Sequence, residues 1–190
     1  SSAASDVYKR QGLASGLISY IDDSIEEAYK QEVLGLTIND TAIDKSVRVV
    51  YTPLNGVGNL PVREVLMRRG FDNVYVVPEQ ELPDPDFTTV GYPNPEVPKA
   101  FAYSEKLGRE VDADILIATD PDCDRVALEV KNPAGEYVFL NGNKIGALLS
   151  YYIFSQRAAL GNLPERPVLV KSIVTGDLSR AIACLLYTSD

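Results

Sequence analysis

Three aspartates follow directly on an apolar run, and this order constrains the fold more than any other stretch of the chain. Residues 113–118 read Ala-Asp-Ile-Leu-Ile-Ala, and residues 120–125 read Asp-Pro-Asp-Cys-Asp-Arg. A short apolar run bounded by turn residues is typical of a buried strand. In open α/β sheets, binding sites lie in the loops that follow the carboxyl ends of strands. The sequence therefore predicts a site in the loop at residues 120–125.

The residue types in this loop predict a bound cation. The charges of Asp120, Asp122 and Asp124 repel one another unless a positive group lies among them. Mg²⁺ and Ca²⁺ prefer carboxylate oxygens, so we expect these side chains to bind a hard divalent cation in preference to forming a solvated acidic turn. The loop is not an EF-hand, because Arg125 stands where that motif requires Gly and Lys131 where it requires Glu.

The rest of the chain alternates between helical and strand patterns. Helices are predicted over 13–35, 60–69, 96–109, 142–160 and 176–183, and strands over 47–51, 74–77, 114–118, 126–131, 137–140 and 167–171. The alternation predicts an α/β fold. Residues 78–95 contain five prolines, so we expect a loop without regular structure. A loop of this length inside a compact domain is usually functional.

Composition excludes several classes of protein. A formal net charge of −9 makes the chain a poor nucleic-acid binder. The absence of His excludes a Ser-His-Asp triad, a Cys-His pair and a His-Glu-x-x-His zinc site within this chain. The longest apolar run, residues 145–154, is too short to span a membrane. Cys123 is the single cysteine outside the two chain ends, which are expected below to be non-native, so no native disulfide is predicted. Disulfides are rare in the reducing cytosol, and we therefore expect a cytoplasmic protein.

Four ordered motifs resemble one enzyme family. The loop at 120–125 resembles the metal-binding loop of the α-D-phosphohexomutases, the phosphoglucomutase/phosphomannomutase superfamily, whose pattern is Asp-x-Asp-x-Asp-Arg. Residues 51–58 (Tyr-Thr-Pro-Leu-Asn-Gly-Val-Gly), 92–96 (Tyr-Pro-Asn-Pro-Glu) and 141–149 (Asn-Gly-Asn-Lys-Ile-Gly-Ala-Leu-Leu) resemble further segments of that family. The resemblance runs from about residue 12 to 183, and it is strongest to the bacterial phosphoglucomutase branch.

This resemblance implies a fold, a cofactor and a reaction. The fold would be a three-layer α/β domain with a mixed sheet, followed by the start of a second similar domain. Asp120, Asp122 and Asp124 would hold Mg²⁺, and Arg125 would be the adjoining catalytic residue. The substrate would be a hexose phosphate, with glucose 1-phosphate and glucose 6-phosphate interconverted through a phosphoserine and a bisphosphorylated sugar. The serine would lie upstream of this chain, so the chain alone would be inactive.

The resemblance also divides the chain. Residues 12–45 would be a helix and linker from the preceding domain, 46–139 the second domain of the family, and 140–183 the start of the third. Residues 1–11 and 184–190 fit no family pattern. DNA that encodes residues 6–11 can be read on its opposite strand as residues 184–188, which resembles a sequencing adapter present at both ends. We therefore expect both ends to be non-native.

Three alternatives stay open. Phosphomannomutase activity is one, because the segment that selects the sugar is expected downstream of this chain. A metal-dependent glycosyltransferase also uses paired aspartates at a strand end, although it explains neither Asp124 nor Arg125. A non-catalytic metal-binding α/β module is the third. Residues 56–58 (Gly-Val-Gly) are interpreted as a tight turn between strand and helix in preference to a phosphate loop, since Pro61 stands where a dinucleotide fingerprint requires Gly. The oligomeric state is not predicted.

Overall fold

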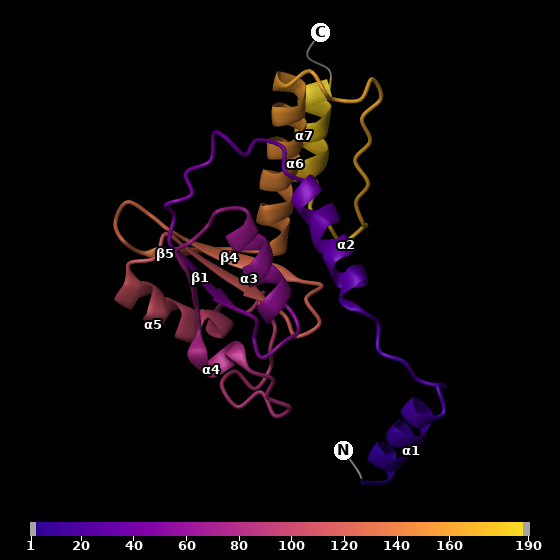
Figure 1. Ribbon diagram of the computed structural model, residues 1–190. Helices are drawn as coiled ribbons and strands as arrows, with labels where there is room; N and C mark the ends of the chain where they lie inside the picture. The colour runs from indigo at the N-terminus through magenta and orange to yellow at the C-terminus, as the bar shows by residue number, and fades with distance from the viewer. Residues whose placement is uncertain (1–2, 188–190) are drawn as a thin grey trace. The chain divides into compact units, whose positions relative to one another are not determined.

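The computed structural model describes residues 3–187, which form two compact units, one up to Leu36 and one from Thr37 onward. Figure 1 shows the course of the chain. Residues 1–2 and 188–190, the outer parts of the two ends predicted to be non-native, lie outside the described residues. The origin of these ends stays a prediction.

The first unit holds two helices, α1 (Ala3–Ala14) and α2 (Asp23–Gly35). The prediction of one helix over 13–35 is therefore wrong between 15 and 22. Gly16 adopts a φ of 76°, which ends α1, and the side chain of Asp22 accepts a hydrogen bond from Ser24 N–H, which starts α2. Apolar periodicity runs across this break, so it gave no sign of the interruption. Ile25 and Tyr29 of α2 are exposed.

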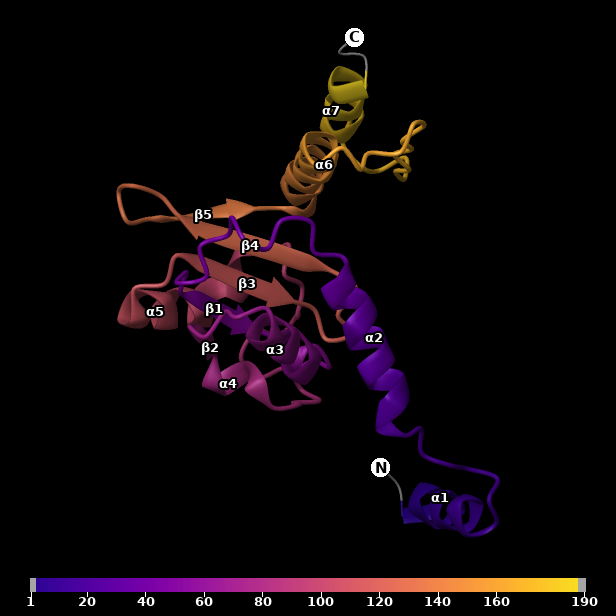
Figure 2. The same cartoon turned by 45° about the horizontal axis from the view of Figure 1, so that its top comes forward.

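The second unit is built on a five-stranded sheet in the order β2-β1-β3-β4-β5. Its strands are β1 (Val49–Thr52), β2 (Val74–Val76), β3 (Ile115–Thr119), β4 (Val126–Lys131) and β5 (Tyr137–Leu140). Strand β1 pairs in parallel with β2 and β3, whereas β3 with β4 and β4 with β5 are antiparallel. Figure 2 shows the sheet with helices beside it. The predicted α/β fold with a mixed sheet is confirmed.

Helices cover this sheet and exclude water from its centre. The helices of this part are α3 (Asn59–Arg68), α4 (Pro78–Glu81), the 3-10 helix η1 (Pro98–Phe101) and α5 (Ala102–Val111). Every residue of β1 is buried, which shows that both faces are covered there. The core contains Val50, Leu116, Ala127 and Phe101, and Leu107 of α5 packs against it. Burial of such side chains is the main favourable term in folding.

Three sequence predictions need correction here. The loop predicted over 78–95 begins with a short helix, α4, because Pro78 fits the first helical position. The helix predicted over 96–109 begins at Pro98 as a 3-10 turn and continues to Val111. Residues 167–171 are not a strand, although their side chains alternate between half-buried and exposed. A strand needs a hydrogen-bonding neighbour, and no described residue supplies one to this segment.

The last two helices, α6 (Gly142–Ala159) and α7 (Leu178–Tyr187), pack against each other. Asn141 caps α6 by accepting a hydrogen bond from Lys144 N–H. Helix α7 includes residues 184–187, and Cys184 lines a cavity of about 330 Å³ together with Phe154 and Leu169. Among the described residues, none of the helices combines the length and the hydropathy that crossing a bilayer requires.

Candidate metal centre

The aspartate loop joins two antiparallel strands, β3 and β4. Asp120 follows directly on β3, and Asp120 N–H donates to the carbonyl of Arg125 at 3.3 Å, which continues the ladder into the loop. A second bond, from Cys123 N–H to the Asp120 carbonyl (3.0 Å), closes a turn inside it. Cys123 has a φ of 62°, which L-residues adopt at a cost. The loop is thus a tight turn that is held by its own backbone hydrogen bonds.

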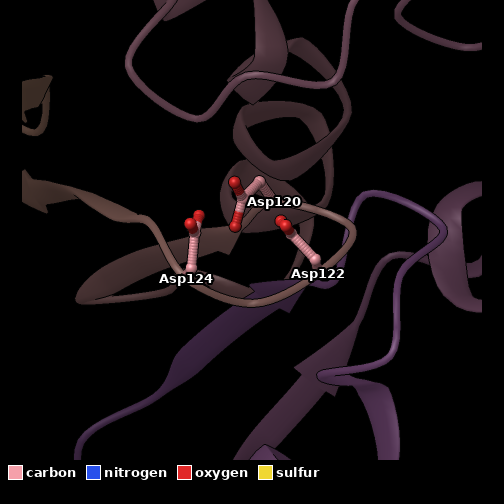
Figure 3. Close-up of side chains that lie close together, drawn as sticks. All are labelled: Asp120, Asp122 and Asp124. Carbon is pink, nitrogen blue, oxygen red and sulfur yellow. The ribbon is translucent and has the colours of Figure 1, made fainter.

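The three aspartates converge in space, as the sequence predicts. One carboxylate oxygen from each of Asp120, Asp122 and Asp124 lies within 4.8 Å of the other two. Figure 3 shows the three side chains turned toward a common space from alternate positions of the loop. Asp120 is fully buried, whereas Asp122 and Asp124 are exposed. The cluster therefore has a fixed base and an open side that a solute can reach.

Arg125 holds Asp120 with two hydrogen bonds. The backbone N–H of Arg125 donates to Oδ1 at 2.9 Å, and its Nε donates to Oδ2 at 2.6 Å. Burial alone would raise the pKa of Asp120, but these bonds outweigh it and lower that pKa below its ordinary value. The Nε of Arg125 also lies 3.6 Å from Asp124 Oδ1. Arg125 is thus an ion-pair partner of the cluster, and its catalytic role stays a prediction.

One guanidinium does not balance three carboxylates. Contact with Asp120 and the charge of Asp122 raise the pKa of Asp124, against the weaker opposing effect of Arg125. The three acidic side chains offer only carboxylate oxygens, which are the donors that hard cations such as Mg²⁺ and Ca²⁺ prefer. The donor set therefore fits such a cation.

The turn that follows β1 is hydrogen-bonded to the aspartate loop. Val57 N–H donates to the Pro121 carbonyl at 2.9 Å. Asn55 is held in turn by Gln80, whose carbonyl accepts the Asn55 N–H at 2.9 Å, and by Leu82, whose carbonyl accepts from Asn55 Nδ2 at 2.7 Å. Residues 56–58 form the tight turn that the sequence predicts, but its contact with the aspartate loop was not predicted. A pair of glycines at the carboxyl end of a strand that neighbours β3 was the available signal.

A buried hydroxyl pair lies beneath the same region. Tyr51 Oη and Thr119 Oγ1 are 2.9 Å apart, and both side chains are buried. Burial raises the pKa of Tyr51 to about 12, so the phenol stays protonated and able to donate. This pair ties the end of β1 to the end of β3, immediately before the aspartates begin.

The proline-rich segment also reaches the loop. Arg125 interacts with Tyr92, which contributes to the raised pKa of its guanidinium after the larger effect of Asp120. A Cβ atom built on Gly142, the first residue of α6, would lie 3.3 Å from Glu96 Oε1. The motif at 92–96 therefore lies between the aspartate loop and the start of α6. The structure thus brings together motifs that are far apart in the sequence.

Comparison with known proteins identifies the family. Residues 25–135 match the family model described as phosphoglucomutase/phosphomannomutase, alpha/beta/alpha domain II. The chain belongs to this family. It is 36% identical over 167 residues to a phosphoglucomutase of Staphylococcus epidermidis, covering 88% of this chain and 30% of that protein. It is 34% identical over 172 residues to the phosphoglucomutase of Staphylococcus saprophyticus, covering 90% and 30%.

A solved structure agrees with this family. A Thermus thermophilus protein assigned as a phosphomannomutase matches with a TM-score of 0.52 and 27% sequence identity, over 73% of this chain and 29% of that one. The chain thus spans about a third of the length of the family members that it matches. The family resemblance inferred from the four motifs is confirmed, and the division of the chain into parts of successive domains stays a prediction.

Proposed function

We propose that this chain is part of a phosphoglucomutase that interconverts glucose 1-phosphate and glucose 6-phosphate through a phosphoserine and a bisphosphorylated sugar. The observation that carries the proposal is the convergence of Asp120, Asp122 and Asp124 within 4.8 Å at a strand end, in a chain of this family. The Staphylococcus relatives named phosphoglucomutase support the choice of glucose. Family membership leaves no support for the glycosyltransferase alternative.

We infer that Mg²⁺ is the cofactor, with Asp120, Asp122 and Asp124 as the residues that would hold it. When bound, the ion would neutralise negative charge and orient the phosphoryl group, which are the main requirements of phosphoryl transfer. The chain itself contributes one prepositioned ligand, since Asp120 is buried and held in place by Arg125 before any ion binds. A preformed site costs less ordering on binding.

Arg125 would bind the transferring phosphoryl group. Its Nε is engaged by Asp120, and 42% of its side chain is exposed beside the aspartates. A guanidinium presents several N–H donors in a rigid plane, which suits phosphate oxygens. Asp120 and Tyr92 would orient that plane. Electrostatic attraction would then hold the phosphate of the hexose phosphate at this site. The groups that recognise the sugar would lie elsewhere in the longer protein.

Phosphomannomutase is the second candidate. The structural match to a Thermus thermophilus protein assigned as a phosphomannomutase favours it. In either case we infer that the phosphoserine is supplied by a part of the longer protein outside this chain, so the chain alone would bind metal without catalysing transfer. Extending the reading frame in the parent DNA tests this, because an upstream Ser-His-Asn-Pro segment is expected.

Activity of the complete protein decides between the two sugars. We expect conversion of glucose 1-phosphate to exceed that of mannose 1-phosphate, and loss of about 100-fold or more in kcat/KM in Asp122→Asn, since each metal ligand matters for such a site. Asp72→Asn is the matched control, because Asp72 is exposed and precedes β2, at the opposite end of the parallel strands. Equal activity of both variants would overturn the metal assignment.

Metal binding can be measured on the chain itself. Calorimetric titration with Mg²⁺ or Mn²⁺ should show modest affinity, because the phosphoserine oxygen expected as a further ligand is absent. Asp122→Ala should weaken binding roughly tenfold or more, whereas Asp72→Ala should leave it unchanged. If all three proteins bind alike, the ion does not sit among the aspartates.

A further inference from the structure

Gly56, in the turn between β1 and α3, has no room for a side chain, and the obstacle is backbone. A Cβ atom at this position would lie 2.3 Å from the Cα of Pro121 and 2.5 Å from its carbonyl oxygen. The next residue, Val57, donates its N–H to that same carbonyl at 2.9 Å. The turn and the aspartate loop are therefore in direct backbone contact, which only Gly at this position permits.

Gly58, two residues further along the turn between β1 and α3, makes a second close contact with the aspartate loop. A Cβ atom here would lie 2.6 Å from Tyr51 Oη, 2.8 Å from Cys123 Sγ and 3.0 Å from Thr119 Oγ1. Tyr51 and Thr119 are buried and hydrogen-bonded to each other, so they cannot easily move aside. Gly58 thus provides the space in which the Cys123 side chain lies.

The two contacts alternate with the aspartates. The turn touches Pro121 and Cys123, which are the residues between Asp120, Asp122 and Asp124. Cys123 has a φ of 62°, a conformation that the surrounding structure must stabilise when the residue is not Gly. Supported residues and converging carboxylates thus occupy alternate positions of one loop.

We propose that Gly56, Val57 and Gly58 are positioning residues that fix the conformation of the aspartate loop, and thereby the distances among its three carboxylates. Because β1 and β3 are parallel neighbours with Thr52 opposite Ala118, the turn that follows β1 lies directly beside the loop that follows β3. The turn binds the loop and leaves phosphate recognition to other groups. The consequence for metal affinity rests on the proposed function, whereas the consequence for loop conformation does not.

The test compares two crowded glycines in the full 190-residue chain. Gly58→Ala places a methyl group against Tyr51 and Cys123. Gly108→Ala is the matched control, since its Cβ would lie 2.7 Å from Tyr137 Oη and 2.8 Å from Leu116 Cδ2, beneath α5. Both variants should lose stability through crowding. Only Gly58→Ala should also change the conformation of the aspartate loop and its affinity for metal.

Two readouts separate positioning from general stability. The ¹H–¹⁵N amide resonances of residues 120–125 should shift in Gly58→Ala and stay in place in Gly108→Ala. The Kd for Mn²⁺ should rise about tenfold or more in Gly58→Ala, as for changes that misplace ligands, and by less than about twofold in Gly108→Ala. Adding Tyr51→Phe to Gly58→Ala removes the nearest obstructing atom, so both readouts should return toward wild type.

The outcomes are distinct for the two proposals. Wild-type chain that binds no Mn²⁺ would contradict the proposed function, and the amide resonances would still decide the positioning role. Folded Gly58→Ala with unshifted loop resonances and unchanged Kd would overturn the positioning role. If Gly58→Ala does not fold, the double variant with Tyr51→Phe takes its place: loop resonances shifted from those of Tyr51→Phe alone and a higher Kd would support the positioning role, and resonances and Kd equal to those of Tyr51→Phe alone would overturn it.

Discussion

Aspartates cluster at both ends of the parallel strands β1 and β3, but positive side chains balance their charge at only one of these ends. At the amino end, Asp112 and Asp114 face Arg48 and Lys131. Arg48 lies 2.5 Å from Asp112 and 3.9 Å from Asp114, and Lys131 lies 2.8 Å and 3.8 Å from the same two carboxylates. At the carboxyl end, Arg125 pairs with Asp120 and Asp124, and Asp122 adds a third carboxylate to the cluster.

The difference distinguishes an ion-pair network from a candidate ligand set. Lys131 and Arg48 lower the pKa of Asp112, so its charge is stabilised within the protein. The pKa of Asp124 is instead raised, chiefly by Asp120 and Asp122. A count of acidic residues would treat the two ends alike. The excess of negative charge at the carboxyl end is what calls for an external cation.

The greatest change in stability is expected at Glu129, a buried acid that forms no ion pair with the described residues. It lies on β4 with 3% of its surface exposed, and its Oε2 has no hydrogen-bond partner within the described residues. Burial, aided by Glu105 and opposed by Arg109, raises its pKa from 4.5 to about 7. Between these values only the unfolded chain ionises, so the free energy of unfolding falls as pH rises through that window.

Above pH 7 this loss is complete and amounts to roughly 3 kcal/mol, at about 1.4 kcal/mol per pH unit. Glu129→Gln should therefore abolish most of the pH dependence and be the more stable protein at pH 8. Urea unfolding from pH 4.5 to 8 measures this, with the exposed Glu110→Gln as control. A variant that keeps the wild-type slope would show that Glu129 ionises normally.

The second effect concerns the base of the aspartate loop. Asp120→Ala removes a buried carboxylate that accepts two hydrogen bonds from Arg125. We expect a loss of about 2 kcal/mol in the free energy of unfolding, because a backbone N–H and a partly exposed guanidinium lose their partner. Asp72→Ala, at an exposed position, should change it by less than about 0.5 kcal/mol. Denaturant unfolding without metal gives both values, and equal stability would show that Arg125 finds another acceptor.

A third comparison uses the two residues with a left-handed backbone conformation, one after β3 and one before it. Cys123 has a φ of 62° and Asp112 a φ of 53°. Cys123→Gly should stabilise the metal-free chain by up to about 1 kcal/mol, because Gly adopts this conformation without strain. Asp112→Gly gains the same relief of strain but loses the exposed ion pairs with Arg48 and Lys131, so it should be stabilised less. Thermal unfolding should show the larger rise in melting temperature for Cys123→Gly, and a lower melting temperature for Cys123→Gly would contradict the strain argument.

The smallest effect tests charge balance directly. Asp122→Asn removes one member of the unbalanced cluster, so without metal it should raise the melting temperature slightly by reducing like-charge repulsion. Asp112→Asn weakens a balanced network and should lower it slightly. Both shifts should shrink in 1 M salt, which screens exposed charges. Shifts of the same sign would mean that the two ends do not differ in the way proposed.

Local sequence patterns predicted most of the sheet and all of the aspartate cluster. Strands β3, β4 and β5 follow from short apolar or alternating runs, and the loop at 120–125 follows from its position after β3. Prediction failed where a distant or absent partner decides the outcome. Residues 167–171 have the alternation of a strand and no described neighbour to pair with, and the 13–35 pattern continues across a break made by Gly16 and Asp22.

Local sequence specifies that three carboxylates leave one tight loop after a buried strand, because apolar runs and alternating aspartates act within a few residues. The groups that support this loop, and those that balance clustered charge, depend on the tertiary fold. Parallel pairing of β1 with β3 places Gly56 and Gly58 against Pro121 and Cys123. At the other end of the sheet, Arg48 and Lys131 reach Asp112 because strands far apart in sequence end side by side, and short-range patterns carry no information about such neighbours.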